Sequence, residues 1–286
     1  MILITGASGL VGEAIYSEII NRHQIVGTSF SSSNTNFIKI DLTNKNDVAN
    51  LFKKYNFTIV IHCAIIIPTD ILNTNAMEEY NGNVRMVANI LDNISVNTRF
   101  INISGTAIYD LKGDNALSET ANIKCETLYQ LAKQHIEDIL YIYYKNNISN
   151  FLNIRISSPY SIKRVSDTVL YKFINSAKYY NKIILWGSGK RTQAFTNIKT
   201  FAEDLSLLLD NKFYGTYNYV TTSRISMQDL AKRISSIKKD LIVKYSGKLD
   251  PEDENRTSID VSSISRYIRQ RDTLNDDIIF IMENML

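Results

Sequence analysis

The chain is poor in cysteine, proline and tryptophan, and it has no long apolar run. Its 286 residues include two cysteines, three prolines and one tryptophan. Cys63 and Cys125 lack the spacing of metal ligands and are too few for a disulfide scaffold, so we expect reduced thiols in a cytoplasmic protein. No apolar run approaches the roughly 20 residues of a membrane span. The N-terminus lacks the basic and apolar regions of a signal peptide, so we expect neither a leader nor a membrane partner.

An excess of charge of one sign is also lacking. The chain has 32 Lys and Arg against 29 Asp and Glu, which gives a net charge of +3. This balance does not indicate a nucleic-acid partner. The three histidines, His23, His62 and His135, form no cluster with Cys, Asp or Glu at ligand spacing, so we expect structural roles for them and no metal site.

The first half of the chain alternates strand-like and helix-like segments. Strands are expected at 2–5, 24–30, 37–42, 57–64, 99–104 and 151–157, and helices at 10–23, 46–55, about 75–95 and within 118–147. This alternation predicts an α/β fold with a doubly wound parallel sheet. Beyond about residue 160 the pattern loosens. We therefore expect a first domain at 1–160 and, at 161–286, a small C-terminal α/β lobe interleaved with it; the motifs in the two parts make the first a dinucleotide-binding domain and the second mostly a substrate-binding lobe.

The stretch "LITGASGLVG" at 3–12 places Gly6, Gly9 and Gly12 between the first strand and the first helix. Gly6 permits a tight turn, Gly9 lets backbone N–H groups approach phosphate oxygens, and Gly12 lets the helix pack closely on the sheet. The helix N-terminus adds free N–H donors and a positive dipole end. The pattern predicts a dinucleotide pyrophosphate site, to which Ser8, Leu10 and Val11 also belong.

The G-x-x-G-x-x-G spacing after Thr5 resembles the short-chain dehydrogenase/reductase superfamily, which has a Rossmann-type fold. "VIHCA" (60–64), "IDL" (40–42), Asn83, "RISSPYS" (155–161), "WGSGKRTQAFTNIKTFAEDL" (186–205) and "TYNYVTTSRISMQDL" (216–230) extend the resemblance to the extended branch of sugar-nucleotide epimerases, dehydratases and reductases. The resemblance implies that Asp41 and Leu42 contact the adenine and that Cys63 and Ala64 lie beside the adenosine. Asn83 matches a structural asparagine of the family.

Tyr129 and Lys133 in "YQLAK" lie four residues apart in an expected helix, so their side chains emerge on one face. A nearby ammonium and a nicotinamide cation would lower the pKa of Tyr129 and suit it to general acid–base work on a sugar hydroxyl or carbonyl. The resemblance also implies that Lys133 binds the ribose of the nicotinamide. Both residues are therefore expected to bind the cofactor as well as to act in catalysis.

The catalytic hydroxyl of the family falls on Gly105 in "NISGTAIYD" (102–110), where no hydroxyl exists. Three explanations stay open: Thr106 supplies the hydroxyl after a small loop shift, which we favour; Ser104 supplies it; or the hydroxyl is missing and activity is weak or altered. A lost hydrogen bond to a developing oxyanion costs about 2.7–4 kcal/mol.

The second half also departs from the family pattern. Ser158 stands where many relatives have Asn, and Gln193 stands where an Arg usually faces the substrate diphosphate. Lys190 or Arg191 is a candidate replacement, since both pair with phosphate. The alternative is that both are solvated turn residues.

The segment around the end of the second expected strand predicts whether the cofactor is NAD(H) or NADP(H). Residues 26–36 contain no Asp or Glu to bind a ribose 2′-hydroxyl, and they contain no Arg. Hydroxyls such as those of Ser29 and Ser31 can donate to a 2′-phosphate, so NADP(H) is favoured, with NAD(H) as the alternative.

The resulting hypothesis is a reductase of a nucleotide-linked keto-sugar, of the 4-keto-6-deoxy type, with Tyr129 as general acid. The alternatives are a nucleotide-sugar 4-epimerase with tightly bound NAD and, in another class, a cofactor-binding regulatory subunit. A dehydratase is disfavoured, because it would need a pair of acidic residues after the fifth strand, where 106–108 is Thr-Ala-Ile. The apolar segment 139–145 suits either a homodimer contact of the family type or a core-facing helix.

Overall fold

The computed structural model describes residues 1–31, 34–67, 76–209, 213–269 and 271–284. It divides into two compact units. Unit 1 comprises Met1–Tyr109, Asn122–Arg155 and Ala202–Tyr217, and unit 2 comprises Asp110–Ala121, Ile156–Phe201 and Asn218–Leu286. The chain therefore enters each unit more than once. Among the described residues, no helix is both long and apolar enough to span a membrane.

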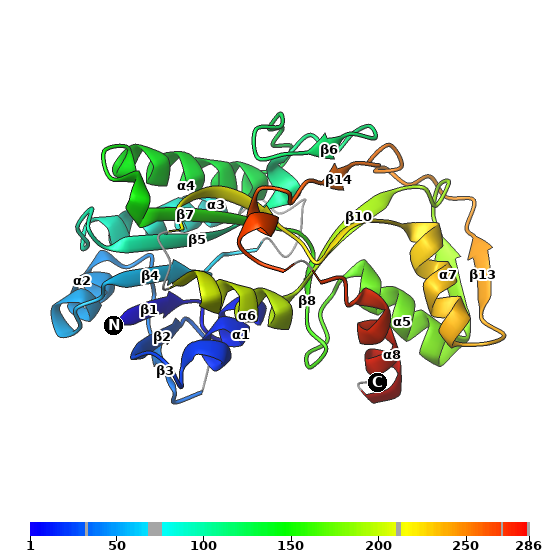
Figure 1. Cartoon of the computed structure of the whole chain (residues 1–286), viewed down its shortest axis with the longest axis horizontal. Helices are drawn as coiled ribbons and strands as arrows, with labels where there is room; N and C mark the ends of the chain where they lie inside the picture. The colour runs from blue at the N-terminus through cyan, green and yellow to red at the C-terminus, as the bar shows by residue number, and fades with distance from the viewer. Residues whose placement is uncertain (32–33, 68–75, 210–212, 270, 285–286) are drawn as a thin grey trace. The chain divides into compact units, whose positions relative to one another are not determined.

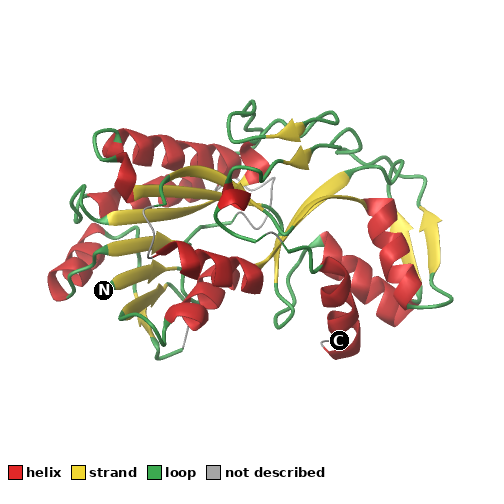
Figure 2. Cartoon of the chain, in the orientation of Figure 1, coloured by secondary structure: helices red, strands yellow, loops and turns green. Residues whose placement is uncertain are grey.

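The described part of unit 1 is built on a seven-stranded sheet in the order β11-β7-β5-β4-β1-β2-β3 (Figures 1 and 2). The strands are β1 (Ile2–Thr5), β2 (Ile25–Ser29), β3 (Phe37–Lys39), β4 (Ile59–His62), β5 (Arg99–Gly105), β7 (Phe151–Ile156) and β11 (Gly215–Tyr219). The pairs β1–β2, β1–β4, β2–β3 and β4–β5 are parallel. The order reverses between β1 and β4, which confirms the predicted α/β, Rossmann-type, doubly wound fold.

The helices of unit 1 cover this sheet. They are α1 (Leu10–Ile19), α2 (Lys45–Lys54), α3 (Ala76–Leu91), α4 (Leu128–Tyr144) and most of α6 (Ile198–Leu209), with 3₁₀ turns η1 (Thr106–Ile108) and η2 (Ile148–Asn150). Side chains of α2, α3 and α4 share one hydrophobic core with the strands. The strands β1 and β7 are buried along their whole length, as expected where helices cover both faces of a parallel sheet.

Helix α4 lies within the segment 118–147 in which a helix is expected. A capping box fixes the start of the helix: the Thr127 hydroxyl accepts from the Gln130 N–H at 3.2 Å, and the Gln130 side chain accepts from the Thr127 N–H at 2.9 Å. Tyr129 and Lys133 therefore lie in the first two turns of the helix. The capping pair sets which face of α4 they share.

Unit 2 is a smaller α/β arrangement with its own core. Its strands are β6 (Ala116–Leu117), β8 (Pro159–Tyr160), β9 (Lys182–Leu185), β10 (Thr192–Asn197), β12 (Thr222–Ser226), β13 (Ile242–Tyr245) and β14 (Ser258–Ile259), and its helices are α5 (Val169–Tyr180), α7 (Met227–Ile237), α8 (Leu274–Asn284), the start of α6 and the 3₁₀ turn η3 (Ile264–Arg266). The strands form the small sheets β12-β10-β8, β13-β9 and β14-β6. The apolar tail at 278–286 predicts a short amphipathic helix; α8 includes 278–284, and residues 285–286 lie outside the described residues.

A buried carboxylate ties α8 to the strands of unit 2. Asp277 accepts hydrogen bonds from the Tyr160 hydroxyl at 2.5 Å, the Asn197 amide at 2.8 Å and the Thr273 hydroxyl at 2.6 Å. Three neutral donors thus replace the water that burial removes from this anion. Burial and the adjacent carboxylate raise the pKa of Tyr160. The contact fixes β8, which directly follows Ser158, and β10, which directly follows Lys190 and Arg191.

Candidate active site

Gly6 and Gly9 lie in the turn from β1 to α1, where the strand order reverses, and Gly12 lies in the first turn of α1. Gly6 has φ +64°, and a Cβ there would lie 2.8 Å from the backbone of Ala64. A Cβ on Gly12 would collide with the Gly6 carbonyl oxygen. Gly9 is the N-cap of α1 and offers no side-chain cap to the helix N–H groups. Leu10 and Val11 open the helix, so the turn presents free backbone donors of the kind that hold a pyrophosphate.

Hydroxyls link this turn to the end of β2. The Ser8 and Ser29 hydroxyls lie 2.7 Å apart, and Ser29 is buried. Ser31 is exposed, and the following residues 32–33 lie outside the described part of the chain. The structure thus brings Ser8 and Ser29 together next to the glycine turn.

The segment after β3 carries the two residues assigned to the adenine. Asp41 accepts from both the backbone N–H of Thr43 at 2.9 Å and its hydroxyl at 2.7 Å through one carboxylate oxygen, Oδ1. Leu42 is buried in the core of unit 1. Asp41 therefore shapes a local turn, while Leu42 anchors it.

The end of β4 is fixed by side-chain hydrogen bonds. The Thr5 hydroxyl lies 2.9 Å from His62 Nδ1 and accepts from the Ala64 N–H at 3.2 Å. Burial, and then the charge of Lys133, lower the pKa of His62 to about 3, so its ring is neutral. Asn83 on α3 holds the same segment from the other side, accepting from the Ile66 N–H at 2.7 Å and donating to the Ile66 carbonyl at 3.0 Å.

Cys63 follows β4, and both cysteines of the chain are free. Burial raises the pKa of the Cys63 thiol to about 12, although the nearby Lys133 opposes that shift. The thiol therefore stays protonated at neutral pH and is a poor nucleophile. Cys63 therefore contributes an uncharged, unreactive side chain next to Lys133.

Lys133 and Tyr129 both extend from the first two turns of α4. Lys133 Nζ donates to the Ile103 carbonyl on β5 at 2.8 Å. Burial lowers the Lys133 pKa to about 8, with Cys63 and Glu137 opposing. Burial raises the Tyr129 pKa, so the Tyr129 hydroxyl remains protonated and is suited to donate a proton. The lowering expected from Lys133 together with a nicotinamide cation stays a prediction.

A buried ion pair lies one turn beyond Lys133. Arg155 on β7 contacts Glu137 through Nε, 3.1 Å from both carboxylate oxygens, and through Nη2, 2.6 Å from Oε2. Arg155 Nη1 also donates to the Tyr109 hydroxyl at 2.6 Å. Sequence reasoning missed this pair. The signal was present, since Arg155 is a charged residue in a mostly apolar strand and Glu137 continues the four-residue spacing of Tyr129 and Lys133.

The two candidate hydroxyls around Gly105 have different surroundings. Ser104 donates its hydroxyl to Glu137 Oε1, so its proton is committed to the ion pair. Thr106 is buried and starts the turn η1, and its hydroxyl has no hydrogen-bond partner among the described residues. Gly105 between them is extended, with φ −146°. Thr106 is thus the hydroxyl with a free proton.

The residues assigned to substrate binding all belong to unit 2. Ser158 has φ +33°, a strained value for a residue with a side chain, and its hydroxyl accepts from the Gln193 amide at 2.6 Å. The two departures from the family pattern are therefore hydrogen-bonded to each other. Arg191 is paired with two acids, Asp250 at 3.1 Å and Glu252, whereas the exposed Lys190 lines a cavity.

A family model described as the NAD dependent epimerase/dehydratase family matches residues 2–219. The chain belongs to this family. The resemblance noted from the motifs is thereby confirmed for the family, while the reductase subgroup stays a prediction. A curated relative, a dTDP-D-glucose 4,6-dehydratase of Dictyostelium discoideum, is 25% identical over 267 residues, which is 82% of this chain but 62% of the relative. The chain therefore spans less than two thirds of the length of this dehydratase.

Solved structures agree on the fold. A UDP-N-acetylglucosamine 4-epimerase from Methanobrevibacter ruminantium, in complex with UDP-N-acetylmuramic acid, superposes with a TM-score of 0.83 and 18% identity over 99% of this chain and 96% of that one. An L-threonine dehydrogenase from Phytophthora infestans gives the same TM-score and identity over 100% and 99%. Identities this low show the fold alone, and the two proteins bear names of different activities.

Proposed function

We propose that the chain is an NAD(P)-dependent reductase of a nucleotide-linked keto-sugar of the 4-keto-6-deoxy type. The observation that carries the proposal is that Tyr129 and Lys133 share one unit with the glycine turn, with Lys133 fixed on the Ile103 carbonyl. A Cβ at Gly6 or Gly12 would strike the protein's own backbone, so these glycines permit the tight turn that opens α1 with backbone N–H donors suited to a pyrophosphate. The nucleotide sugar is proposed from the sequence motifs and from the names of several relatives.

Nicotinamide, when bound, supplies the hydride for this reaction. Tyr129 donates its hydroxyl proton to the carbonyl oxygen of the sugar, which becomes an alcohol when carbon takes the hydride. Lys133 carries the positive charge that stabilises the phenolate left on Tyr129. The Thr106 hydroxyl donates a hydrogen bond to the same oxygen and so fills the role of the hydroxyl missing at Gly105.

One feature disfavours dehydration among the reactions of the family. The turn η1 that follows β5 contains Thr-Ala-Ile at 106–108 and offers no carboxylate for a dehydration. The epimerase remains the second candidate because a 4-epimerase shares the fold along the whole chain. A regulatory subunit is the third.

We propose NADPH as the preferred donor. The described residues at the end of β2 include the buried Ser29 and the exposed Ser31, and residues 26–36 contain no carboxylate to repel a 2′-phosphate. The family description names NAD, which stays the alternative. A cytoplasmic location also stays a prediction.

We also propose a homodimer that uses the end of α4. Tyr141 and Ile142 are 62% and 63% exposed, while Leu140 and Tyr144 are buried in the core of unit 1. The segment 139–145 therefore has one face in the core and a second apolar face available for a partner. Sedimentation of the chain and of a Tyr141→Glu, Ile142→Glu double variant tests this, and a monomeric parent would contradict it.

The first experiment is to denature the purified protein and identify any released nucleotide, then to titrate the stripped protein with NADPH and NADH. An empty site that prefers NADPH, with stoichiometric NADPH oxidation in the presence of a nucleotide-linked 4-keto sugar, supports the reductase. Tightly bound NAD and turnover without net oxidation would instead identify an epimerase. Absence of binding to either nucleotide would overturn both.

A further inference from the structure

The turn η1, which carries Thr106, depends on its surroundings for its shape. It contains three residues, and its closing backbone hydrogen bond runs from the Tyr109 N–H to the Thr106 carbonyl at 3.2 Å. Hydrogen bonds of this 3₁₀ type have poorer geometry than those of an α-helix, and so short a piece gains little stability from them. The position of the Thr106 hydroxyl is therefore decided by the contacts that anchor the end of this turn.

Tyr109 is the residue at which the turn is anchored. It is the C-cap of η1 and is 2% exposed. Its backbone forms an antiparallel bridge with Ile123, and the adjacent Ile108 carbonyl accepts from the Lys124 N–H at 2.8 Å. Its hydroxyl accepts from Arg155 Nη1 at 2.6 Å, and the guanidinium carbon of Arg155 lies 5.0 Å from the centre of its ring. The turn is thus held through both the backbone and the side chain of Tyr109.

Arg155 can serve as an anchor because it is itself held in place. Its Nε and Nη2 contact the Glu137 carboxylate, and both side chains of this pair are 7% exposed. Burial acts to lower the pKa of Arg155, but the hydrogen bond and the charge of Glu137 outweigh burial and raise that pKa, so the guanidinium stays charged. Its planar fork of donors binds a carboxylate and a phenol at once. Tyr109 therefore receives a charge-assisted hydrogen bond from a fixed donor.

The buried pair also reaches the helix of the proposed proton donor. Glu137 lies on α4, about two turns after Tyr129, whereas Arg155 lies on β7. The contacts from Tyr109 through Arg155 to Glu137 therefore connect the turn η1 with α4. This connection sets the distance between the Thr106 and Tyr129 hydroxyls, which are the two groups proposed to act on one substrate oxygen.

We propose that Tyr109 is a positioning residue, whose hydrogen bond from Arg155 holds the turn η1, and with it the Thr106 hydroxyl, where the reaction needs it. The inference rests on the proposed function, in which Thr106 donates to the sugar oxygen. Tyr109 acts through Thr106 and contacts neither substrate nor cofactor in this role. A displacement of about 1 Å can lower a rate by up to about 100-fold. Removal of this one hydroxyl should therefore lower kcat while every reacting group is still present.

Hydrogen exchange of the full-length protein tests the anchoring without any substrate. Tyr109→Phe keeps the ring and removes only the hydroxyl. The backbone amides of residue 109 and of Lys124 report on the turn, because both are hydrogen-bonded to it. We expect both amides to exchange about tenfold faster than in the parent, since loss of a charged hydrogen bond favours local opening. Parental exchange rates in Tyr109→Phe would overturn the proposal.

Tyr144→Phe is the matched control for this variant. The Tyr144 hydroxyl is also buried, but it donates to the Thr98 carbonyl at 2.7 Å from the last residue of α4. Its removal should leave the exchange of both reporter amides and kcat unchanged. Equal acceleration of the two amides in Tyr144→Phe and in Tyr109→Phe would contradict a specific role of Tyr109.

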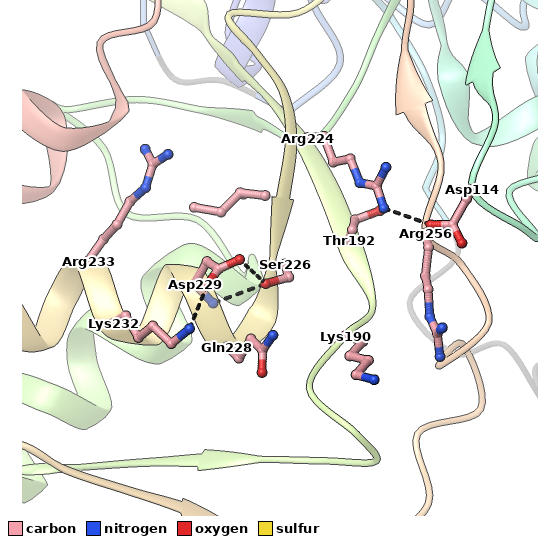
Figure 3. A pocket seen from close by; sticks show the side chains of 11 residues that line it. Asp114, Lys190, Thr192, Arg224, Ser226, Gln228, Asp229, Lys232, Arg233 and Arg256 are labelled. Carbon is pink, nitrogen blue, oxygen red and sulfur yellow. Dashed lines mark hydrogen bonds and ion pairs between the residues drawn. The ribbon is translucent and has the colours of Figure 1, made fainter.

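Arginine-to-lysine variants test the other side of the contact. Arg155→Lys keeps the charge beside Glu137 but replaces the fork of donors by a single ammonium, so we expect it to accelerate the same two amides. Arg224→Lys is its control, because Arg224 forms an exposed ion pair with Asp114 at a cavity of unit 2 (Figure 3). This control should leave the exchange at η1 unchanged. Parental exchange at η1 in Arg155→Lys would show that the turn does not depend on Arg155 and would refute the proposal.

Kinetics distinguish positioning from a loss of stability. With a nucleotide-linked keto-sugar as substrate, Tyr109→Phe should lower kcat about 10- to 100-fold and leave KM for the dinucleotide nearly unchanged. Added to Thr106→Ala, it should have little further effect on kcat, because Tyr109 acts through that hydroxyl. Additive losses in the double variant would indicate a purely structural role and would overturn the proposal. Absence of reduction by the parent would instead overturn the proposed function, and the exchange rates would still decide whether Tyr109 holds the turn.

Discussion

In unit 1, Arg155 and Glu137 form an ion pair in which each side chain is 7% exposed, whereas in unit 2, Arg224 and Asp114 form a pair whose side chains are 40% and 67% exposed. The buried pair is completed by Ser104 and Tyr109, so removing one partner leaves a charge without solvent. The exposed pair is solvated and exchanges partners at little cost. The buried pair therefore fixes geometry around α4, whereas the exposed pair leaves the arginine able to change partners.

The largest effect on activity is expected at Tyr129, the proposed proton donor on α4. Tyr129→Phe removes the proton donor and leaves the buried ion pair intact, so we expect kcat to fall about 10²- to 10⁴-fold without loss of stability. Steady-state kinetics and thermal unfolding measure the two quantities. A variant with nearly full activity would contradict the role assigned to Tyr129.

Breaking the buried pair tests the first side of the comparison. Arg155→Met leaves the Glu137 carboxylate buried without its cation, and we expect the free energy of unfolding to fall by about 3–5 kcal/mol. The double variant Glu137→Met, Arg155→Met removes both charges and should recover much of that loss. Chemical denaturation measures all three proteins. Equal losses in the single and double variants would show that packing rather than charge is at stake.

The hydroxyls of Ser104 and Thr106, on either side of Gly105, are expected to differ in the same way: one supports the buried ion pair and the other the reaction. Thr106→Ala should lower kcat about 100- to 1000-fold, which corresponds to the loss of one oxyanion donor. Ser104→Ala is the matched control, because this hydroxyl serves Glu137 and not the substrate; we expect a loss of stability near 1 kcal/mol and a much smaller change in kcat. The reverse order of the two effects on kcat would move the catalytic role to Ser104.

The pH dependence reports on Lys133. Its pKa of about 8 means that the ammonium is protonated below pH 8 and loses its charge above it. Because that charge stabilises the Tyr129 phenolate, we expect kcat/KM to decline as pH rises through about 8. The Lys133→Arg variant keeps its positive charge across this pH range. If it retains measurable activity, its kcat/KM should not decline above pH 8. A profile that is flat to pH 10 would exclude this role for Lys133.

The smallest effect is expected at the exposed pair. Asp114→Asn removes the partner of Arg224 at the cavity, and we expect the free energy of unfolding to change by about 0.2–1 kcal/mol. A comparison with Arg155→Met in the same denaturant series measures the difference between the two ion pairs directly. A loss of several kcal/mol at Asp114 would remove the distinction on which the comparison depends.

The sequence alone determined the frame of the molecule. Alternating apolar strands and amphipathic helices predicted the doubly wound sheet, and the glycine spacing located the turn from β1 to α1. The four-residue spacing of Tyr129 and Lys133 placed both on one helix face. These features depend on contacts between near neighbours in the chain, or on a backbone conformation that few residues adopt, so they can be read locally.

The tertiary structure decided which side chains are available. Ser104 and Thr106 look alike in the sequence, but Glu137, 33 residues from Ser104, takes up one of the two hydroxyls. Arg191 was a candidate for a phosphate until the fold paired it with Asp250 and Glu252, the latter 61 residues away. Partners at such distances are chosen by packing and desolvation rather than by periodicity. That is why the sequence named the candidates for this site, and only the folded chain distinguishes the free groups from the committed ones.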